Sequence, residues 1–252
     1  MIVALIVTAL IVFGGSSFAF KDSDLDGVED SVDRCPNTPI LVLVDKHGCP
    51  LKRERLYIRI GTGFLKDSRE ERSYLLTSLA YALGGFYTSF TVRYYNYSKL
   101  HGSGMGDSTL FLGHSTYVGK LYLLPGIRIK IPTGDKPFST GELDFTPSFV
   151  MDYLFGKNDA FLYSSYTFRG DKRYKNTFTI SAGVGREFGD ALYASISYDL
   201  SESAIRKGYN RYFSLFILYD LTRSLYTTLS YSKGINKEAV DHSATVRLGI
   251  RF

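Results

Sequence analysis

Alternate acidic residues near the start of the chain have the spacing of a calcium-binding loop. Carboxylates stand at positions 1, 3, 5, 9 and 12 of the segment, a glycine at position 6 permits a sharp bend, and position 7 offers its backbone carbonyl. Ca²⁺ prefers about six to eight oxygen ligands, and carboxylates at this density would repel one another without a cation. The alternative is a solvated acidic linker. The predicted calcium ligands are Asp22, Asp24, Asp26, Val28, Asp30 and Asp33.

The chain has two cysteines, Cys35 and Cys49, and both lie just after the acidic residues. A lone pair of cysteines in an exported protein most simply forms one disulfide, because exported proteins mature in an oxidising compartment. A zinc-type site is disfavoured, since two cysteines with His47 alone beside them do not complete a tetrahedral ligand set.

Further motifs surround these cysteines: Cys-Pro-x-Thr-Pro at 35–39, Val-Asp at 44–45 and Gly-Cys-Pro at 48–50. Together with the aspartates, they make the segment similar to a thrombospondin type 3 repeat, in the form found in outer-membrane proteins related to OmpA. The resemblance implies a Cys35–Cys49 bridge, and a calcium ion that stiffens a segment without a core. It adds Asp45 as a further candidate ligand. In those relatives the repeats link a barrel to a peptidoglycan-binding domain. Here the repeat precedes the bulk of the chain, so peptidoglycan binding is not implied.

The first residues are apolar from Ile2 to Phe13 and small around Ser17–Ala19, which is typical of a secretory signal peptide at 1–19. The alternative is an uncleaved membrane anchor, but about twelve apolar residues are short for a membrane span. No later run of eighteen apolar residues occurs. The expected organisation is the signal peptide, a calcium-binding module at 20–52 and one large domain at 53–252.

From about Arg55 onward, apolar and polar residues alternate in segments of roughly ten residues, as in amphipathic β-strands. Twenty Tyr and eighteen Phe, with no Trp, make 15% of the chain aromatic. Such residues favour β structure and suit the aromatic girdles of membrane barrels. We predict twelve strands, at 55–64, 74–83, 86–97, 108–118, 120–132, 144–154, 159–169, 176–187, 190–200, 210–221, 223–233 and 242–252.

Strand length and connection length distinguish a transmembrane barrel from a soluble β-sandwich. Strands of about nine to eleven residues match a tilted membrane-spanning strand, and short turns that alternate with long loops are typical of bacterial outer-membrane barrels. The short turns are expected at 84–85, 119–120, 156–159, 189–190 and 222–224, and the long loops at 65–73, 98–107, 133–143, 170–175, 201–209 and 234–241. We therefore predict an all-β, antiparallel up-and-down transmembrane barrel. Its long loops would face outward, and the N-terminal module would lie in the periplasm.

The last predicted strand ends on Phe252, which resembles the C-terminal aromatic signal by which outer-membrane proteins reach their assembly machinery. The resemblance implies that machinery and outer-membrane lipids as partners, and the bacterial outer membrane as the location. The net charge of +5 is spread without a Lys/Arg cluster, so nucleic acid is not an expected partner.

Glycine- and proline-containing segments at 102–107, 125–134 and 144–147 are similar to parts of the outer-membrane family of the phenol-degradation meta pathway. That family is regarded as transporter- or porin-like and has no firmly assigned substrate. The resemblance therefore implies a transport function.

Passage of a small solute is the function that the pattern favours. Twelve strands would enclose a lumen between that of filled eight-stranded barrels and that of open sixteen-stranded porins. An excess of Arg and Lys over acidic residues on the predicted inner faces indicates a preference for anions. The alternative is a lumen plugged by salt bridges, in a barrel with a structural or interaction role. The lumen-lining candidates are Arg59, Arg93, Arg128, Lys130, Asp152, Asp199, Asp220, Arg247 and Arg251.

An outer-membrane lipid hydrolase or protease is a less favoured interpretation. His114 and Ser115 are adjacent, so they would face opposite sides of a strand and could not act as a pair. The other histidines, His47, His101 and His242, do not stand in a recognisable catalytic motif. We predict no catalytic residues and Ca²⁺ as the cofactor.

Overall fold

The computed structural model describes residues 22–24, 27–36, 44, 47–49, 55–68, 70–205 and 208–252. The predicted signal peptide at 1–19 and the predicted ligands Asp26 and Asp45 lie outside these residues. In the described part of the chain, no helix is long and apolar enough to span a membrane.

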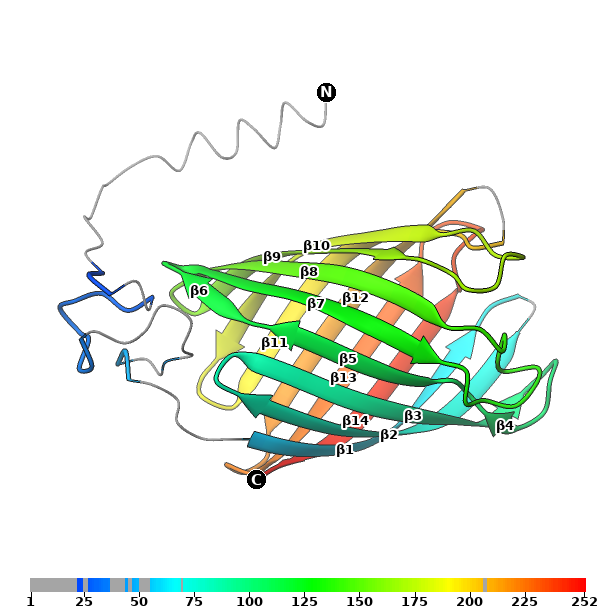
Figure 1. Ribbon diagram of the computed structural model, residues 1–252, viewed down its shortest axis with the longest axis horizontal. Helices are drawn as coiled ribbons and strands as arrows, with labels where there is room; N and C mark the ends of the chain where they lie inside the picture. Colours follow the sequence, from blue (N-terminus) through cyan, green and yellow to red (C-terminus); the bar gives the residue numbers. More distant parts are fainter. Residues whose placement is uncertain are drawn as a thin grey trace.

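The residues from Arg55 onward form one closed antiparallel β-barrel of twelve staves, as predicted (Figure 1). We call each of the twelve strand positions around the ring a stave. Every stave is a single strand except the fourth, which consists of the successive short strands β4, β5 and β6. The strands are β1 (Arg55–Lys66), β2 (Glu71–Leu83), β3 (Phe86–Ser98), β4 (Gly104–Met105), β5 (Ser108–His114), β6 (Thr116–Val118), β7 (Leu121–Ile131), β8 (Asp144–Phe155), β9 (Asn158–Thr167), β10 (Thr177–Phe188), β11 (Leu192–Glu202), β12 (Tyr209–Asp220), β13 (Leu225–Gly234) and β14 (His242–Arg251).

The predicted strand at 108–118 is divided at Ser115 into β5 and β6. The backbone N–H and the hydroxyl of Ser115 both donate to the carbonyl oxygen of Gly85, at 2.8 and 3.2 Å. These bonds attach the chain to the β2–β3 turn, and the regular ladder is interrupted as a result.

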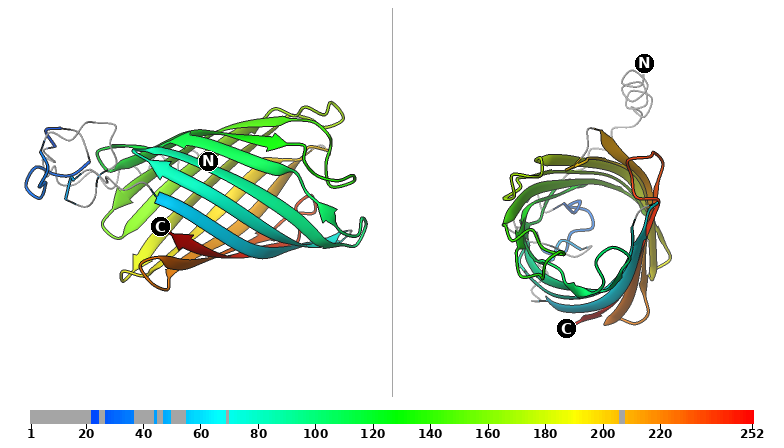
Figure 2. Two further views of the ribbon diagram at one scale, coloured as in Figure 1. Left: turned by 60° about the horizontal axis from the view of Figure 1, so that its bottom comes forward. Right: turned by 90° about the vertical axis from the view of Figure 1, so that its right-hand side faces the viewer.

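β1 closes the barrel by pairing with β2 on one side and with β14 on the other. The β1–β14 register runs from Tyr57 opposite Arg251 to Lys66 opposite His242. The end-on view in Figure 2 shows the resulting ring. Closure leaves the staves without an unpaired edge, which a strand at membrane depth requires because lipid cannot hydrogen-bond with the backbone.

The outward side chains form an aliphatic belt between two aromatic girdles. In the belt, Ile60, Leu75 and Ile196 are each more than half exposed. Exposed aromatic residues lie toward one end of the barrel at Phe86, Tyr153, Phe155, Phe188 and Tyr219, and toward the other at Tyr94, Tyr97, Phe145, Tyr166, Phe168 and Tyr198. Apolar surface on this scale is unfavourable in water and is stable against lipid.

The connections at the two ends of the barrel differ in length, as expected. Turns of two to four residues join β2 to β3, β6 to β7, β8 to β9, β10 to β11 and β12 to β13. The longer loops lie at the opposite end, where 132–143 is the longest of them (Figure 1). The first of these loops is shorter than predicted, since pairing between β1 and β2 continues to Lys66 opposite Glu71.

The barrel interior is not a packed apolar core. Among the described residues, the buried apolar side chains are Leu76, Ala80, Tyr226 and Ala239, and no large side chain is fully buried. Inward glycines leave room for long neighbours to lie along the wall. An added Cβ at Gly61 would stand 2.8 Å from Cγ of Arg247. The wall is therefore lined by polar and aromatic side chains that face a lumen.

The described part of the N-terminal module lies beyond the short-turn end of the barrel (Figure 1). Cys35 and Cys49 form a disulfide with their Cα atoms 4.9 Å apart, as the sequence predicts. Gly27 has a φ of 96°, a conformation that favours glycine, and it lies against Tyr117 and Gly119 at the β6–β7 turn. The module thus contacts the barrel at the end where the turns are short.

Candidate functional site

The inner face of the barrel carries every predicted lumen-lining residue, because each has the opposite parity to the lipid-facing apolar residues of its strand. The lumen has a basic wall on β14, β1, β2 and β3. Staves six places apart are opposite in a closed ring of twelve, so this wall faces β8, β9, β10 and β11. The residues lie as follows: Arg59 on β1, Arg93 on β3, Arg128 and Lys130 on β7, Asp152 on β8, Asp199 on β11, Asp220 on β12, and Arg247 and Arg251 on β14.

Strand register brings three arginines together on the basic wall. Arg247 is opposite Gly61, Gly61 is opposite Leu76, and Leu76 is opposite Arg93, so one row crosses four strands. Arg59 lies two residues from Gly61 on the same face of β1. Arg59 and Arg93 both repel the charge of Arg247 electrostatically. We call Arg59, Arg93 and Arg247 the arginine row.

Tyrosines and a glycine position the arginine row. Arg59 donates from Nε to the hydroxyl of Tyr226 at 2.7 Å and from Nη1 to the hydroxyl of Tyr87 at 2.9 Å. The guanidinium of Arg93 lies 4.8 Å from the ring centroid of Tyr74, in cation–π geometry. Arg247 extends across Gly61, where any larger residue would displace it.

The arginine row is not neutralised by carboxylates. Within the residues that the structure describes, Arg59, Arg93 and Arg247 form no ion pair with Asp or Glu, and neither does Arg128. Arg128 and Arg247 are also exposed, although they face inward. Both side chains are therefore accessible from the lumen, and both retain their positive charge.

The opposite wall is acidic and rich in hydroxyl groups. A cavity of about 390 Å³ along it is lined by residues that include Asp152, Tyr163, Tyr193 and Asp199. Asp199 accepts a hydrogen bond from Ser197 at 2.9 Å and a second one from Ser214. Oδ1 of Asp152 is buried, without a hydrogen-bond partner among the described residues. The carboxylate of Asp199 is therefore satisfied by neutral hydroxyl groups and keeps its negative charge.

The two ends of the lumen differ from its middle, because at both ends the charged side chains form ion pairs. At the short-turn end, Arg251 and Asp220 form an ion pair of 2.6 Å. At the loop end, Lys130 lies 3.3 Å from Asp107 and 3.2 Å from Asp144, and Arg169 lies 3.2 Å from Asp144. Nothing in the sequence pattern indicated this second network. Hairpin register would have found part of it, since Lys130 is directly opposite Asp144.

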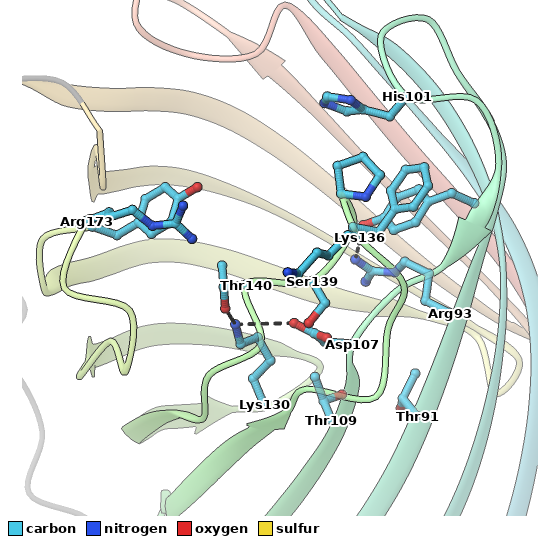
Figure 3. A pocket seen from close by; sticks show the side chains of 14 residues that line it. Thr91, Arg93, His101, Asp107, Thr109, Lys130, Lys136, Ser139, Thr140 and Arg173 are labelled. Atoms are coloured by element: carbon cyan, nitrogen blue, oxygen red, sulfur yellow. Dashed lines mark hydrogen bonds and ion pairs between the residues drawn. The ribbon is translucent and has the colours of Figure 1, made fainter.

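The loop at 132–143 folds against the inner wall at the outer mouth. Phe138 stacks on Tyr95 with ring centroids 4.7 Å apart, and Nζ of Lys130 donates to the hydroxyl of Thr140 at 2.8 Å. A cavity of about 700 Å³ lies between this loop and Arg173. Figure 3 shows Arg173 on the side of the cavity opposite Arg93. The sequence predicted a long loop at 133–143, but it could not predict that the loop folds inward, because the contacts that hold it there are tertiary.

Several known structures share the fold of this barrel. An outer membrane channel from Pseudomonas putida F1 has a TM-score of 0.65 at 11% identity, over 79% of this chain and 94% of that one. The NanC porin has a TM-score of 0.56 at 12% identity, over 77% and 98% of the two chains. The KdgM porin has a TM-score of 0.54 at 10% identity, over 78% and 98%. This chain has the fold of outer-membrane channels. Together with the aliphatic belt, the channel fold places the barrel in the bacterial outer membrane.

One curated relative matches part of the chain. Outer membrane porin F of Pseudomonas aeruginosa is 42% identical over an alignment of 73 residues, which covers 25% of this chain and 21% of that protein. The chain thus matches about a fifth of the length of porin F. No family model matches the chain.

Three histidines of the barrel lie in contacts that do not form a catalytic pair. The ring of His114 packs on Phe86, while Ser115 points to the other side of the strand toward Gly85. His101 contacts Phe138, and Nδ1 of His242 is 2.7 Å from the hydroxyl of Tyr231. The expected separation of His114 from Ser115 is present.

The predicted calcium loop fits a cation in part. Oδ2 of Asp22 accepts a hydrogen bond from the backbone N–H of Gly27 at 2.9 Å, and its Oδ1 is buried without a hydrogen-bond partner in the described residues. Ser23 donates to both carboxylate oxygens of Asp30, and Cys35 donates to Asp33. The described residues hold no group of three or more His, Cys, Asp or Glu side chains placed for a metal ion. Asp22 and Asp24 therefore each present a buried carboxylate oxygen that suits a cation.

Proposed function

We propose that the barrel is a narrow porin for small hydrophilic anions. The observation that carries the proposal is the arginine row, in which Arg59, Arg93 and Arg247 face the lumen without a carboxylate partner in the described chain. A fixed positive charge in a water-filled passage concentrates anions and repels cations. The absence of large, fully buried side chains inside the described barrel supports an open lumen over a packed one.

The two walls make one side of the passage positive and the facing side negative, so an electric field crosses the lumen at right angles to the barrel axis. The arginine row lies on β14, β1 and β3, while Asp152 and Asp199 lie on the facing staves. An anion that crosses the barrel would stay near the arginine row and exchange its water for guanidinium donors. Because the row sits on rigid strands, the donors keep their positions as the solute passes.

Flux into liposomes tests this proposal. Purified full-length protein is reconstituted, and the rates of entry of lactate, of erythritol as a neutral solute and of ethanolamine as a cation are compared. We expect lactate to enter fastest and ethanolamine slowest, about threefold or more apart, because selection acts on charge. The same rate for all three solutes would contradict charge selection, and no flux above that of empty liposomes would contradict an open lumen.

A plugged barrel with a structural role is the second candidate. The observation that favours it is the pairing of charges at both ends of the lumen, by Arg251 with Asp220 and by Lys130 with Asp107 and Asp144. Such pairs can hold side chains across an opening. The liposome experiment distinguishes the two functions, since a plugged barrel admits none of the solutes.

We also propose that the N-terminal module binds Ca²⁺ and that it is a thrombospondin-type repeat. A relation of the barrel to the outer-membrane family of the phenol-degradation pathway is a further proposal. If Asp22 and its neighbours hold Ca²⁺, chelation with EDTA will make the segment at 20–50 more sensitive to limited proteolysis. The barrel will stay intact, because its strands do not depend on that segment for pairing. Asp22→Asn will have the same effect without EDTA. Equal cleavage with and without EDTA would contradict calcium binding.

A further inference from the structure

The cavity at the outer mouth has an unbalanced charge. Its lining includes four cationic side chains, Arg93, Lys130, Lys136 and Arg173, and one carboxylate, Asp107. Hydroxyl groups of Thr91, Thr109, Ser139 and Thr140 complete much of its polar surface. The question is which of these cations are already neutralised by neighbours.

Two of the four cations are neutralised. Lys130 belongs to the network with Asp107, Asp144 and Arg169, in which two positive and two negative groups balance. Arg173 forms an ion pair of 2.6 Å with Asp171, and the same contact lowers the pKa of the Asp171 carboxyl. Neither cation therefore has a full charge left for a ligand.

The other two cations retain their charge. Arg93 contacts the ring of Tyr74 and the hydroxyl of Tyr95, both of them neutral groups. Lys136 is exposed on the inward loop, and in the described part of the chain it has no ion pair. Its neighbour in sequence, Asp135, does not line the cavity: the Asp135 carboxylate accepts a hydrogen bond from the backbone N–H of Met105 at 2.8 Å. Two positive charges thus remain in the cavity.

The shape and the lining of the cavity favour a small organic ligand. A volume of about 700 Å³ exceeds the space that one simple ion needs. Figure 3 shows Arg93 and Lys136 on one side of the cavity, with Arg173 extending toward it from the other side. The stacked rings of Tyr95 and Phe138 fix the loop that carries Lys136, so this charge is held at the mouth.

We propose that this cavity binds small organic dianions, with Arg93 and Lys136 as the residues that neutralise the two negative charges. The ligand carries two carboxylate charges or one phosphate group, and the hydroxyl groups of the wall bind its remaining oxygens. The inference rests on the proposed anion channel, of which this would be the outer recognition site. Arg93 is shared by the cavity and the arginine row, so a bound ligand lies next to the passage.

Binding is tested on purified full-length protein in detergent by isothermal titration calorimetry, which does not require an open channel. The probes are succinate, glycerol 3-phosphate, acetate as a monoanion and glycerol as a neutral compound. We expect at least one dianion to bind, at least about fivefold more tightly than acetate, because a second charge adds a second Coulombic contact. The dianion that binds more tightly identifies the preferred oxyanion, and no binding of glycerol is expected.

The decisive variants are Lys136→Gln and the control Lys237→Gln. Lys237 is exposed on another outer loop, at 235–241, and does not line the cavity. Lys136→Gln should weaken dianion binding about fivefold and change acetate binding less, whereas Lys237→Gln should leave both unchanged. Absence of dianion binding to the unmodified protein, or an equal loss in the two variants, would overturn the proposal. Failure of the channel itself is seen separately in the liposome experiment, so the two proposals can fail independently.

Discussion

The two walls of the lumen carry opposite charges, and each of them holds its charges with neutral partners. On the basic wall, Arg59 donates to the hydroxyls of Tyr226 and Tyr87. On the facing wall, Asp199 accepts from serine hydroxyls, and Asp159 accepts from Tyr193 at 3.0 Å. At both ends of the lumen, in contrast, opposite charges meet directly as ion pairs.

This difference shows how a barrel can fix charged side chains without cancelling them. A hydroxyl group or an aromatic ring satisfies part of a guanidinium but leaves its net charge in place. Positive and negative walls that face each other across water then act on every solute between them. The ion pairs at the ends of the lumen connect different staves at the rims and contribute little net charge to the lumen.

The largest expected effect comes from reversing the charge of the arginine row. In the double variant Arg93→Glu/Arg247→Glu, each substitution changes the local charge by two units and makes the basic wall acidic. We expect the ratio of chloride to potassium permeability to fall about tenfold or more and to pass below one. Planar-bilayer reversal potentials in a KCl gradient measure this ratio.

The control is Lys237→Glu on an exposed outer loop, a reversal of two charge units, which equals each single substitution of the double variant. The control should keep the permeability ratio of the unmodified protein. If the loop variant shifted the ratio as much as the double variant does, selection would depend on overall charge and the contrast between the walls would be irrelevant.

A smaller and opposite effect is expected from the acidic wall. Asp152→Asn removes one negative charge that faces the basic wall, so anion preference should increase about twofold. Glu238→Gln, an exposed substitution in the loop at 235–241, provides the control with an equal loss of charge. A decrease in anion preference in Asp152→Asn would show that the facing wall does not oppose the arginine row.

Gly61→Ala sharpens the comparison by moving an arginine without changing any charge. The new Cβ would lie 2.5 Å from the carbonyl oxygen of Val246 and 2.8 Å from Cγ of Arg247. We expect a loss of about 1–3 kcal/mol in the free energy of unfolding from overpacking, together with a modest fall in anion preference. In an Arg247→Ala background the fall in preference should disappear while the loss of stability largely remains, since the backbone clash persists. A fall in preference that remained in that background would exclude Arg247 as its cause.

The smallest effect on selectivity is expected from Glu70, which belongs to neither wall. Burial alone would raise the pKa of Glu70, but hydrogen bonds from Arg72 and Ser98 outweigh it and bring the pKa below its usual value. A depressed pKa in the folded state means that the stabilisation exists above the pKa of the unfolded chain, and is lost as the pH falls through the folded value. Below about pH 4, the loop at 67–70 should therefore become more sensitive to acid proteases. Glu70→Gln should be sensitive already at neutral pH, with an unchanged permeability ratio. A loop in Glu70→Gln as resistant at neutral pH as the unmodified loop would contradict this role.

Strand number and the parity of the charged residues could be predicted because lipid outside and water inside impose a period of two on every stave. The terminal strand is an example: Val246 and Leu248 face outward and Arg247 faces inward. Parity alone does not say which inward residues are neighbours. Arg247 lies opposite Gly61 through the closure of β14 on β1, and this pairing joins residues 186 positions apart in sequence.

The inward position of the loop at the outer mouth could not be predicted from the sequence, for a different reason. The loop at 132–143 has polar and glycine residues typical of any exposed loop, and nothing local in its sequence directs it inward. Its position depends on Phe138 meeting Tyr95 and on Thr140 meeting Lys130. Strand pairing could be anticipated from pattern, but these side-chain contacts depend on the finished barrel.

The most direct test of the central claim is the reversal potential of the unmodified protein in a planar bilayer under a tenfold KCl gradient. An open lumen with an arginine row that retains its charge predicts single-channel conductance. It also predicts a reversal potential of the sign expected when chloride is more permeant than potassium. Conductance with a reversal potential that shows potassium to be more permeant would contradict the role of the arginine row. An absence of channel events would contradict an open lumen.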